Sequence, residues 1–318
     1  MFTDLYVTDF RGIQALKLFG FSRVNLIVGE NNTGKTTLLE ALTLVSAPQE
    51  AGEISQRMRL SSRLRNPNRW LRRDGSESAF SKIILKNAES ELAVSLSPAT
   101  YKAQTHHKGT PLEHVSNLGE YRFGCSIRHP KLKVRVVPIQ HRYPNDLVGD
   151  FSTAVDLKDG EKELESLLNS VDSRIKSVRL SYEKETNLPY ISADIGLSER
   201  VPIDQLGQGV NRLIAIFCEL LGQRPAICFI DEIENGLHHT VLKRVWQGIA
   251  VAAERLNIQV FATTHSRECL EAAHECFSER ESYDFRVVQL YRVRDQIDGR
   301  VLPQDLIEAA VNSDIEVR

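Results

Sequence analysis

One nine-residue stretch, GENNTGKTT at positions 29–37, constrains the fold more than any other part of the chain. It follows VNLIV at 24–28, which predicts a buried parallel strand, and precedes LLEALTLV at 38–45, which predicts a helix. The stretch matches the pattern G-x4-G-K-[ST], in which glycines let backbone N–H groups cradle phosphate oxygens at a helix N-terminus. A chance match in a loop is the alternative, and the flanking strand and helix disfavour it. The pattern predicts that Lys35 reaches the β- and γ-phosphates of a nucleotide and that the Thr36 hydroxyl ligates magnesium.

A second buried strand ends in two acids. The run AICFIDE, at 226–232, places Asp231 at the strand tip and Glu232 directly after it. In a phosphate-loop protein, such a pair can hold magnesium through water and polarise the attacking water as a general base. The alternative is a pair of solvated acids. We favour a hydrolytic site over a phosphotransferase, because a second carboxylate here suits activation of water better than that of a substrate hydroxyl.

Two further segments belong to the same candidate site. The run QVFATTHS, at 259–266, predicts a strand parallel to the first two, with His265 at its tip in reach of a γ-phosphate. A lone histidine is otherwise more often structural. The run LGQGVNRLIAIFCELL, at 206–221, predicts an apolar helix opened by two glycines, whose free N–H groups form an anion site. A plain turn before a core helix is the alternative for that segment.

The composition fits a cytoplasmic globular protein. The 318-residue chain is 42% hydrophobic and 26% charged, enough for a sizeable core, and its net charge of −2 gives no overall attraction to nucleic acid or membranes. No apolar run approaches the roughly 18 residues that span a bilayer, and the N-terminus lacks a signal pattern. The cysteines form no C-x-x-C pair, and we expect free thiols in a reducing compartment at Cys125, Cys218, Cys228, Cys269 and Cys276.

Taken together, these segments resemble ATP-binding-cassette (ABC) ATPases. Their order along the chain is similar to the RecF/SMC branch, and most of all to the ATPase part of OLD-family proteins. The opening LYVTDFRGIQAL, at 5–16, is similar to that family's x-x-x-N-F-R-x-h start, and DEIENGLHH, at 231–239, to its D-E-P-E-N-G-L-H-P run. The resemblance covers about residues 1–45 and 200–300. It implies an α/β P-loop NTPase fold with a mixed or parallel sheet, an antiparallel β-subdomain and a helical, basic insertion.

The resemblance also assigns roles to individual residues. It implies ATP and Mg²⁺ as cofactors, with Asp231 ordering the metal together with Thr36. Glu232 would be the catalytic base, and His265 the switch histidine. The residues that bind phosphate and magnesium would be Asn31, Asn32, Gly34, Lys35, Thr36 and Thr37.

A site shared between two chains follows from the same resemblance. The segment that caps the γ-phosphate of a second copy, here the signature segment, would be Leu206, Gly207, Gln208 and Gly209. The loop that passes between the copies, here the crossing loop, would be Glu234, Asn235, Gly236 and Leu237. ATP would then join two copies head to tail. Gly207 departs from the family's frequent serine, which removes a hydroxyl and puts the strength of dimerisation in question. His238 and His239 adjoin this loop, a reading we favour over metal binding.

The middle of the chain, residues 48–205, is an insertion between the phosphate loop and the signature segment. Its segment 56–73, QRMRLSSRLRNPNRWLRR, has no acid and carries the arginines Arg57, Arg59, Arg63, Arg65, Arg69, Arg72 and Arg73. Such a block commonly binds nucleic-acid phosphates, and arginine and tryptophan can stack on bases. A solvated loop and an arginine face for an acidic partner are the alternatives.

Beyond residue 80, the pattern changes to strands. The runs FSKIIL, ELAVSLS, YRFGCSI and KLKVRVVPI predict an antiparallel sheet, and 101–117 between them, with three histidines, is interpreted as a surface loop. Gln140 is the candidate for a glutamine that links magnesium to this lobe. An amphipathic helix at 160–172 and a hairpin at 177–196 are predicted next. After His265, a helix at 268–279, a strand pair and a closing helix are predicted, with no room for a nuclease domain.

We therefore expect one ABC-type ATPase domain over residues 1–318, built from a lobe at 1–47, an inserted lobe at 48–205 and a lobe at 206–318. The first functional hypothesis is an ATPase that dimerises around ATP and regulates a separate effector such as an antiphage nuclease. The alternative is a RecF-like, DNA-binding ATPase of repair or recombination. The motor of a membrane transporter is disfavoured, because LGQGV and the N-F-R-like opening are not transporter features.

Overall fold

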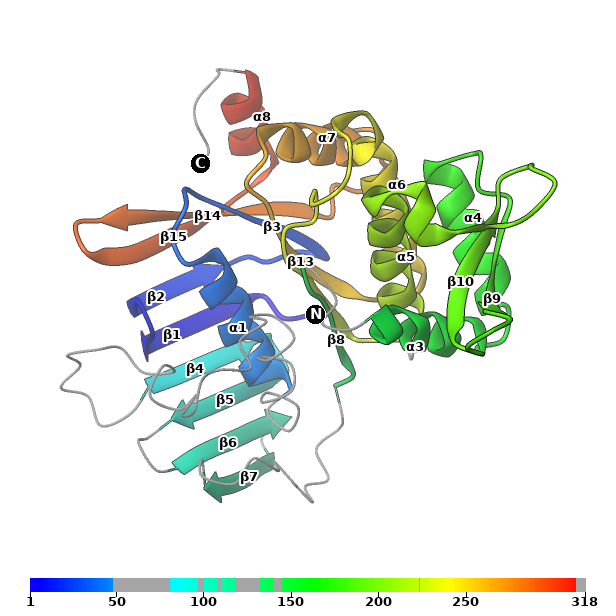
Figure 1. Ribbon diagram of the computed structural model, residues 1–318. Coiled ribbons are helices and arrows are strands. Elements are labelled where there is room, and N and C mark those ends of the chain that lie inside the picture. The colour runs from blue at the N-terminus through cyan, green and yellow to red at the C-terminus, as the bar shows by residue number, and fades with distance from the viewer. Residues whose placement is uncertain are drawn as a thin grey trace.

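The computed structural model describes residues 1–47, 81–96, 100–107, 110–117, 132–139, 144–222 and 224–312. Within them the strands form two six-stranded sheets and one three-stranded sheet, and most of the helices cover one side of the parallel sheet (Figure 1). The fold is α/β, as the sequence predicts, and both the parallel and the antiparallel strands are present.

The central sheet positions the candidate site. Its order is β15-β14-β3-β13-β12-β8, and all neighbours are parallel except β14 and β15. The strands are β3 (Val24–Val28), β8 (Val134–Val137), β12 (Ile227–Ile230), β13 (Gln259–Thr263), β14 (Phe285–Val293) and β15 (Gln296–Leu302). The prediction that the strand before His265 runs parallel to the other two is confirmed. Because carboxyl ends of parallel strands share one edge, the loops after β3, β12 and β13 meet there.

The second sheet is antiparallel, with the order β2-β1-β4-β5-β6-β7. Its strands are β1 (Asp4–Phe10), β2 (Ile13–Phe19), β4 (Ser81–Lys86), β5 (Ser90–Leu96), β6 (Thr100–His107) and β7 (Thr110–Asn117). The N-terminal hairpin and the inserted strands therefore share one sheet, in which Leu5 lies opposite Leu85. The sequence indicated the inserted strands but not this pairing across more than 70 residues.

Helix α1 (Lys35–Ser46) packs against strands of both sheets. Its Leu38 and Leu42 are fully buried in a core shared with the antiparallel sheet. Alternate residues of β3 point to opposite faces, so Ile27 joins that core while Leu26 enters a second core beneath the other helices. Burial on both faces explains why the strand reads as a continuous apolar run.

The remaining elements form a helical layer on the far side of the central sheet (Figure 1). They are α3 (Pro144–Val155), α4 (Gly160–Val171), α5 (Gln208–Leu221), α6 (His239–Arg255), α7 (Arg267–Ser278), α8 (Gln304–Asn312), the 3-10 turn η2 (Ile203–Leu206) and the strands β9 (Ser177–Tyr182), β10 (Pro189–Asp194) and β11 (Val201–Pro202). The amphipathic helix, the hairpin and the C-terminal helix–strand pair–helix order are confirmed. Helix α3 has no counterpart in the sequence prediction.

Two predictions about the insertion are wrong. The segment 101–117 is not a surface loop but most of β6 and β7, which pair in register with His114 opposite Ala103. Its side chains are too polar to show a strand pattern, and the backbone ladder to β5 orders it instead. The run KLKVRVVPI does not join the antiparallel sheet: β8 pairs in parallel with β12 at the edge of the central sheet, and Val134, Val136 and Val137 are all buried there.

Several predictions fall on residues that the structure leaves undescribed. Gln140, Cys125, the run YRFGCSI and the arginine block at 56–73 lie outside the described residues. The other four cysteines are free and buried. No helix in the described ranges is long and apolar enough to cross a bilayer.

Candidate functional site

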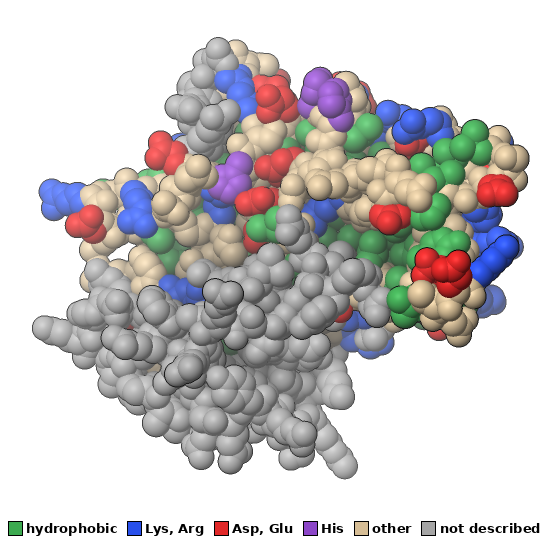
Figure 2. Space-filling model, viewed as in Figure 1, with side chains coloured by type: hydrophobic (Ala, Val, Ile, Leu, Met, Phe, Trp, Pro, Cys, Tyr) green, Lys and Arg blue, Asp and Glu red, His purple; other side chains and the backbone are tan. Residues whose placement is uncertain are grey.

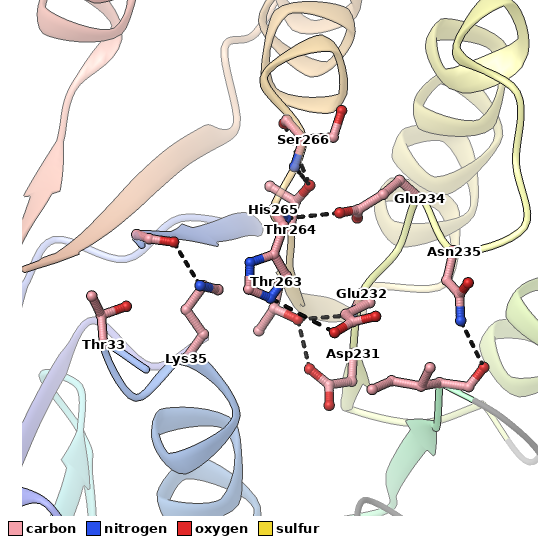
Figure 3. Close-up of polar contacts among 12 residues, drawn as sticks. Thr33, Lys35, Asp231, Glu232, Glu234, Asn235, Thr263, Thr264, His265 and Ser266 are labelled. Atoms are coloured by element: carbon pink, nitrogen blue, oxygen red, sulfur yellow. Dashed lines mark hydrogen bonds and ion pairs between the residues drawn. The ribbon is translucent and has the colours of Figure 1, made fainter. Parts of the chain in front are cut away.

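The phosphate loop, the two acids and the histidine meet at one edge of the central sheet (Figure 3). Lys35 begins α1, while Asp231 and Glu232 follow β12 and His265 follows β13. In the close-up, Lys35 lies on one side and the acids on the other, with the His265 ring between them. Strand order β3-β13-β12 thus brings Lys35 together with Asp231 and His265, which stand 196 and 230 residues further along the chain.

The phosphate loop is closed around the Lys35 ammonium. Lys35 Nζ donates to the carbonyl oxygens of Gly29 at 2.6 Å and Glu30 at 2.8 Å. Burial lowers the pKa of Lys35 to about 8, against the opposing effect of the acids at the β12 tip. Gly34 has φ +93° and precedes the helix, a conformation that glycine adopts without strain. The lysine is thus held pointing into the loop, as phosphate binding requires.

The β14–β15 hairpin supports this loop from outside, which the sequence did not indicate. Arg292 donates through Nε and Nη2 to the carbonyl oxygen of Asn32, at 3.1 and 2.8 Å. Asn32 itself is left-handed, with φ +64°. A Cβ at Gly29 would lie 2.4 Å from the carbonyl oxygen of Leu290, so only glycine fits where the loop meets β14. The sequence around the phosphate loop gives no indication of this contact, because Arg292 lies 260 residues further along the chain.

Asp231 fits a magnesium site. Thr263 Oγ1 donates to its Oδ1 at 2.6 Å, while Oδ2 is buried and accepts no hydrogen bond from any residue that the structure describes. Burial raises the pKa of Asp231, and the hydroxyls of Thr263 and Thr36 favour its charged form. A carboxylate oxygen and a nearby hydroxyl are ligands that Mg²⁺ prefers, beside phosphate oxygens and water. Thr36 and Asp231 would hold the ion, which would supply charge neutralisation at the phosphates.

Glu232 follows Asp231 with its carboxylate open to solvent, as the predicted role of a general base requires. Its backbone is left-handed, with φ +45°, and its N–H donates to Thr263 Oγ1 at 2.8 Å. The carboxylate Oε1 lies 3.7 Å from His265 Nε2, and both side chains remain more than a third exposed, so water can reach them. Burial raises the pKa of Glu232. A carboxylate with a raised pKa near solvent is suited to take a proton from water.

His265 is joined to the crossing loop. Its backbone N–H donates to Glu234 Oε1 at 2.7 Å, and Asn235 Nδ2 donates to the carbonyl oxygen of Ile139 at 3.4 Å. Ile139 follows β8, so the crossing loop contacts the tips of two strands. In the space-filling view, histidine and acidic side chains gather at the surface of this face (Figure 2).

The signature segment lies beside the crossing loop of its own chain. Leu206 ends η2, Gly207 has φ +96°, and α5 begins at Gln208. A Cβ at Gly209 would lie 3.0 Å from the carbonyl oxygen of Gly236, so the two segments are in close contact. Gly207 and Gln208 are exposed. Leu206 packs against the core beneath the helices, while the exposed Gly207 and Gln208 leave the start of α5 open to solvent.

His238 and His239 do not form a metal site with other described residues. No group of three or more histidine, cysteine, aspartate or glutamate side chains in the described part of the chain could hold a metal ion together. The His238 side chain instead accepts from the Thr240 N–H and caps α6. The two rings lie 4.2 Å apart between centroids.

Two protein-family models match this chain, one over the segment with the phosphate loop and one over the segment with the two acids and His265. The family model described as "AAA domain, putative AbiEii toxin, Type IV TA system" matches residues 63–271, more than half of the chain. A second, described as "Protein of unknown function (DUF2813)", matches residues 1–53. An "ATP/GTP phosphatase" of Helicobacter pylori is 21% identical over 336 residues, covering 88% of this chain and 90% of that protein. The DNA replication and repair protein RecF of Myxococcus xanthus is 32% identical over 127 residues, covering 39% of this chain and 28% of RecF.

Comparisons of structure find the heads of SMC proteins. An SMC head bound to the C-winged helix domain of ScpA has a TM-score of 0.59 at 12% identity and covers 97% of this chain and 99% of that chain. The SMC head domain from Thermotoga maritima has a TM-score of 0.50 at 16% identity, covering 95% and 98%. At such identity the likeness concerns the fold alone. The chain therefore belongs to the AAA-domain family described as a putative AbiEii toxin of the type IV TA system, and it is a P-loop ATPase with the fold of an SMC head.

Proposed function

We propose that ATP and Mg²⁺ close two copies of this cytoplasmic ATPase head to tail and that hydrolysis reopens them. The observation that carries the proposal is the exposed start of α5. Gly207 and Gln208 face solvent, and the N-terminus of the helix behind them offers free N–H groups to an anion. The γ-phosphate bound to a second copy is an anion that could fill this position. The crossing loop beside it would then contact the same second copy.

Closure would control a separate effector, as the resemblance to OLD-family ATPases implies, and an antiphage nuclease is the first candidate. Two comparisons support a regulated partner without naming it. The family description refers to a toxin of a TA system. One of the matching SMC heads was solved bound to a domain of another protein.

The test is the mass of the protein in solution, measured by light scattering with Mg²⁺ and ATP, with Mg²⁺ and ADP, and without nucleotide. The single chain has a mass of 35.9 kDa. We expect the mass to double with ATP only, because the γ-phosphate is the group that the second copy would bind. A mass that is the same in all three conditions would contradict ATP-driven closure by the isolated chain. The absence of a serine hydroxyl at Gly207 would then be the first explanation for the lack of dimerisation.

A RecF-like role on DNA is the second candidate, favoured by the match to RecF and by the arginine block. If these arginines bind duplex phosphates, the affinity for a short duplex should fall steeply with salt. For 6–10 phosphate contacts the expected loss is about 10³- to 10⁵-fold between 50 and 200 mM salt. Fluorescence anisotropy measures this, with Arg72→Gln/Arg73→Gln as the comparison, for which we expect a shallower salt dependence. No binding at 50 mM salt would exclude the DNA role.

A further inference from the structure

A buried arginine that no motif singled out lies directly behind the catalytic acids. Arg212 is in the second turn of α5 and is only 6% exposed. Its Nη2 donates to the carbonyl oxygens of Asp231 at 2.5 Å and Glu232 at 3.0 Å, and its Nη1 to that of Pro138 after β8. One guanidinium thus joins the helix that follows the signature segment to the tips of β12 and β8.

These bonds complete the restraint of Glu232. Thr263 Oγ1 holds the N–H of Glu232, and Arg212 holds its carbonyl oxygen. Between these two bonds the residue keeps φ at +45°, a conformation that non-glycine residues seldom adopt and that neighbouring contacts must maintain. This backbone conformation is the one from which the carboxylate reaches to 3.7 Å from the His265 ring.

We propose that Arg212 is a positioning residue for hydrolysis, which holds the backbone of Asp231 and Glu232 so that the Glu232 carboxylate is aimed at the attacking water. A guanidinium suits this position because its planar set of donors can serve several carbonyls at once, whereas an ammonium cannot match that geometry. The proposal concerns the ATPase reaction itself and does not depend on dimerisation.

The test compares Arg212→Met and Arg212→Lys with the wild type in steady-state ATP hydrolysis. We expect Arg212→Met to lower kcat by about 10- to 100-fold, the usual effect of a small misplacement of a catalytic group, with KM for ATP nearly unchanged. Arg212→Lys keeps the charge and one or two of the bonds, so its kcat should be intermediate. Equal kcat values for all three proteins would overturn the proposal.

A matched control is an arginine that fastens the same helix from strand β8. Arg135 on β8 forms a 3.2 Å ion pair with Glu219, which is 1% exposed and two turns further along α5. Arg135→Met therefore also removes an arginine that fastens α5 to β8, but away from the acids. We expect it to lower the melting temperature while kcat stays within about twofold of the wild type. A loss of kcat as large as that of Arg212→Met would mean that fastening α5, not positioning Glu232, matters.

A double-mutant cycle separates positioning from general damage. If Arg212 acts through Glu232, Arg212→Met should cause no further loss of kcat in the Glu232→Gln background, because the group it positions is already gone. If the two losses multiply, Arg212 acts independently of Glu232 and the proposal fails. Should Arg212→Met not fold, the same cycle with Arg212→Lys gives the answer.

Discussion

Replacing Glu232 with glutamine is expected to reduce kcat for ATP hydrolysis by about 10²- to 10⁴-fold, the usual contribution of a general base. Glutamine keeps the size of the side chain but cannot accept a proton from water. Because the Glu232 carboxylate is more than a third exposed, its loss leaves no unpaired buried charge, and stability should change little. Steady-state phosphate release measures kcat, and thermal unfolding verifies the fold.

The same variant should bind ATP but not release it. In the proposed cycle hydrolysis reopens the dimer. The Glu232→Gln protein should therefore remain a dimer, with twice the molecular mass of the single chain, for as long as ATP and Mg²⁺ are present. Light scattering at successive times after ATP addition distinguishes this trapped dimer from the transient one of the wild type. A mass that stays at that of the single chain while kcat falls would leave Glu232 as the base and contradict closure.

Glu254→Gln is the matched control. Glu254 is an exposed carboxylate at the C-terminal end of α6, away from the site, and is paired with Arg280. We expect its kcat and its mass with ATP to equal those of the wild type. If Glu232→Gln behaved like Glu254→Gln in both measurements, another group would have to activate the water.

Replacing Lys35 with methionine is expected to weaken ATP binding by at least about 100-fold. Charge-assisted hydrogen bonds are worth about 1.5–3 kcal/mol each, and the ammonium is placed to form two or more with phosphate oxygens. Methionine has a similar length and suits the buried position, so the loss reports the charge rather than a cavity. Isothermal titration with a slowly hydrolysed ATP analogue measures the affinity.

Lys17→Met, on the exposed face of β2, serves as the control for removing a positive charge. It should bind the analogue as the wild type does. Lys35 also holds the carbonyls of Gly29 and Glu30, so a lower melting temperature of Lys35→Met without nucleotide is expected as well. Near-normal affinity of Lys35→Met would show that the backbone N–H groups alone carry phosphate binding.

The sequence predicted the parts of the site whose residues are neighbours in the chain. A phosphate loop needs glycines, a lysine and a threonine at fixed spacing between a strand and a helix, and all of these stand within 29–37. The ends of β12 and β13 could be predicted in the same way. One apolar run ends at Asp231 and the other shortly before His265, and such an abrupt change to polar residues marks the end of a buried strand. Adjacency of these strands then follows from the fold class.

Strand partners in the insertion were less readable. The run at 101–117 carries polar residues throughout, so no alternation revealed β6 and β7. The apolar run at 131–139 predicted a strand. The hydrophobic pattern of a single strand does not show whether its partner runs parallel or antiparallel to it. The sheet that β8 joins depends on the burial of Val134 and Val137 beside β12, which lies about 90 residues further along the chain.

By itself, then, the sequence determined which residues are candidates for the site: the phosphate loop, the acid pair and the histidine each stand in a short local segment. Only the tertiary structure decided what holds them. Arg292 reaches Asn32, Thr263 reaches Asp231, and Arg212 reaches Glu232 across separations of 260, 32 and 20 residues. These contacts leave no local pattern. Those of Arg292 and Arg212 end on backbone carbonyls, which every residue type carries, and that of Thr263 joins side chains at the ends of two separate strands. The position of the donor is fixed only once the sheet and its helices are packed.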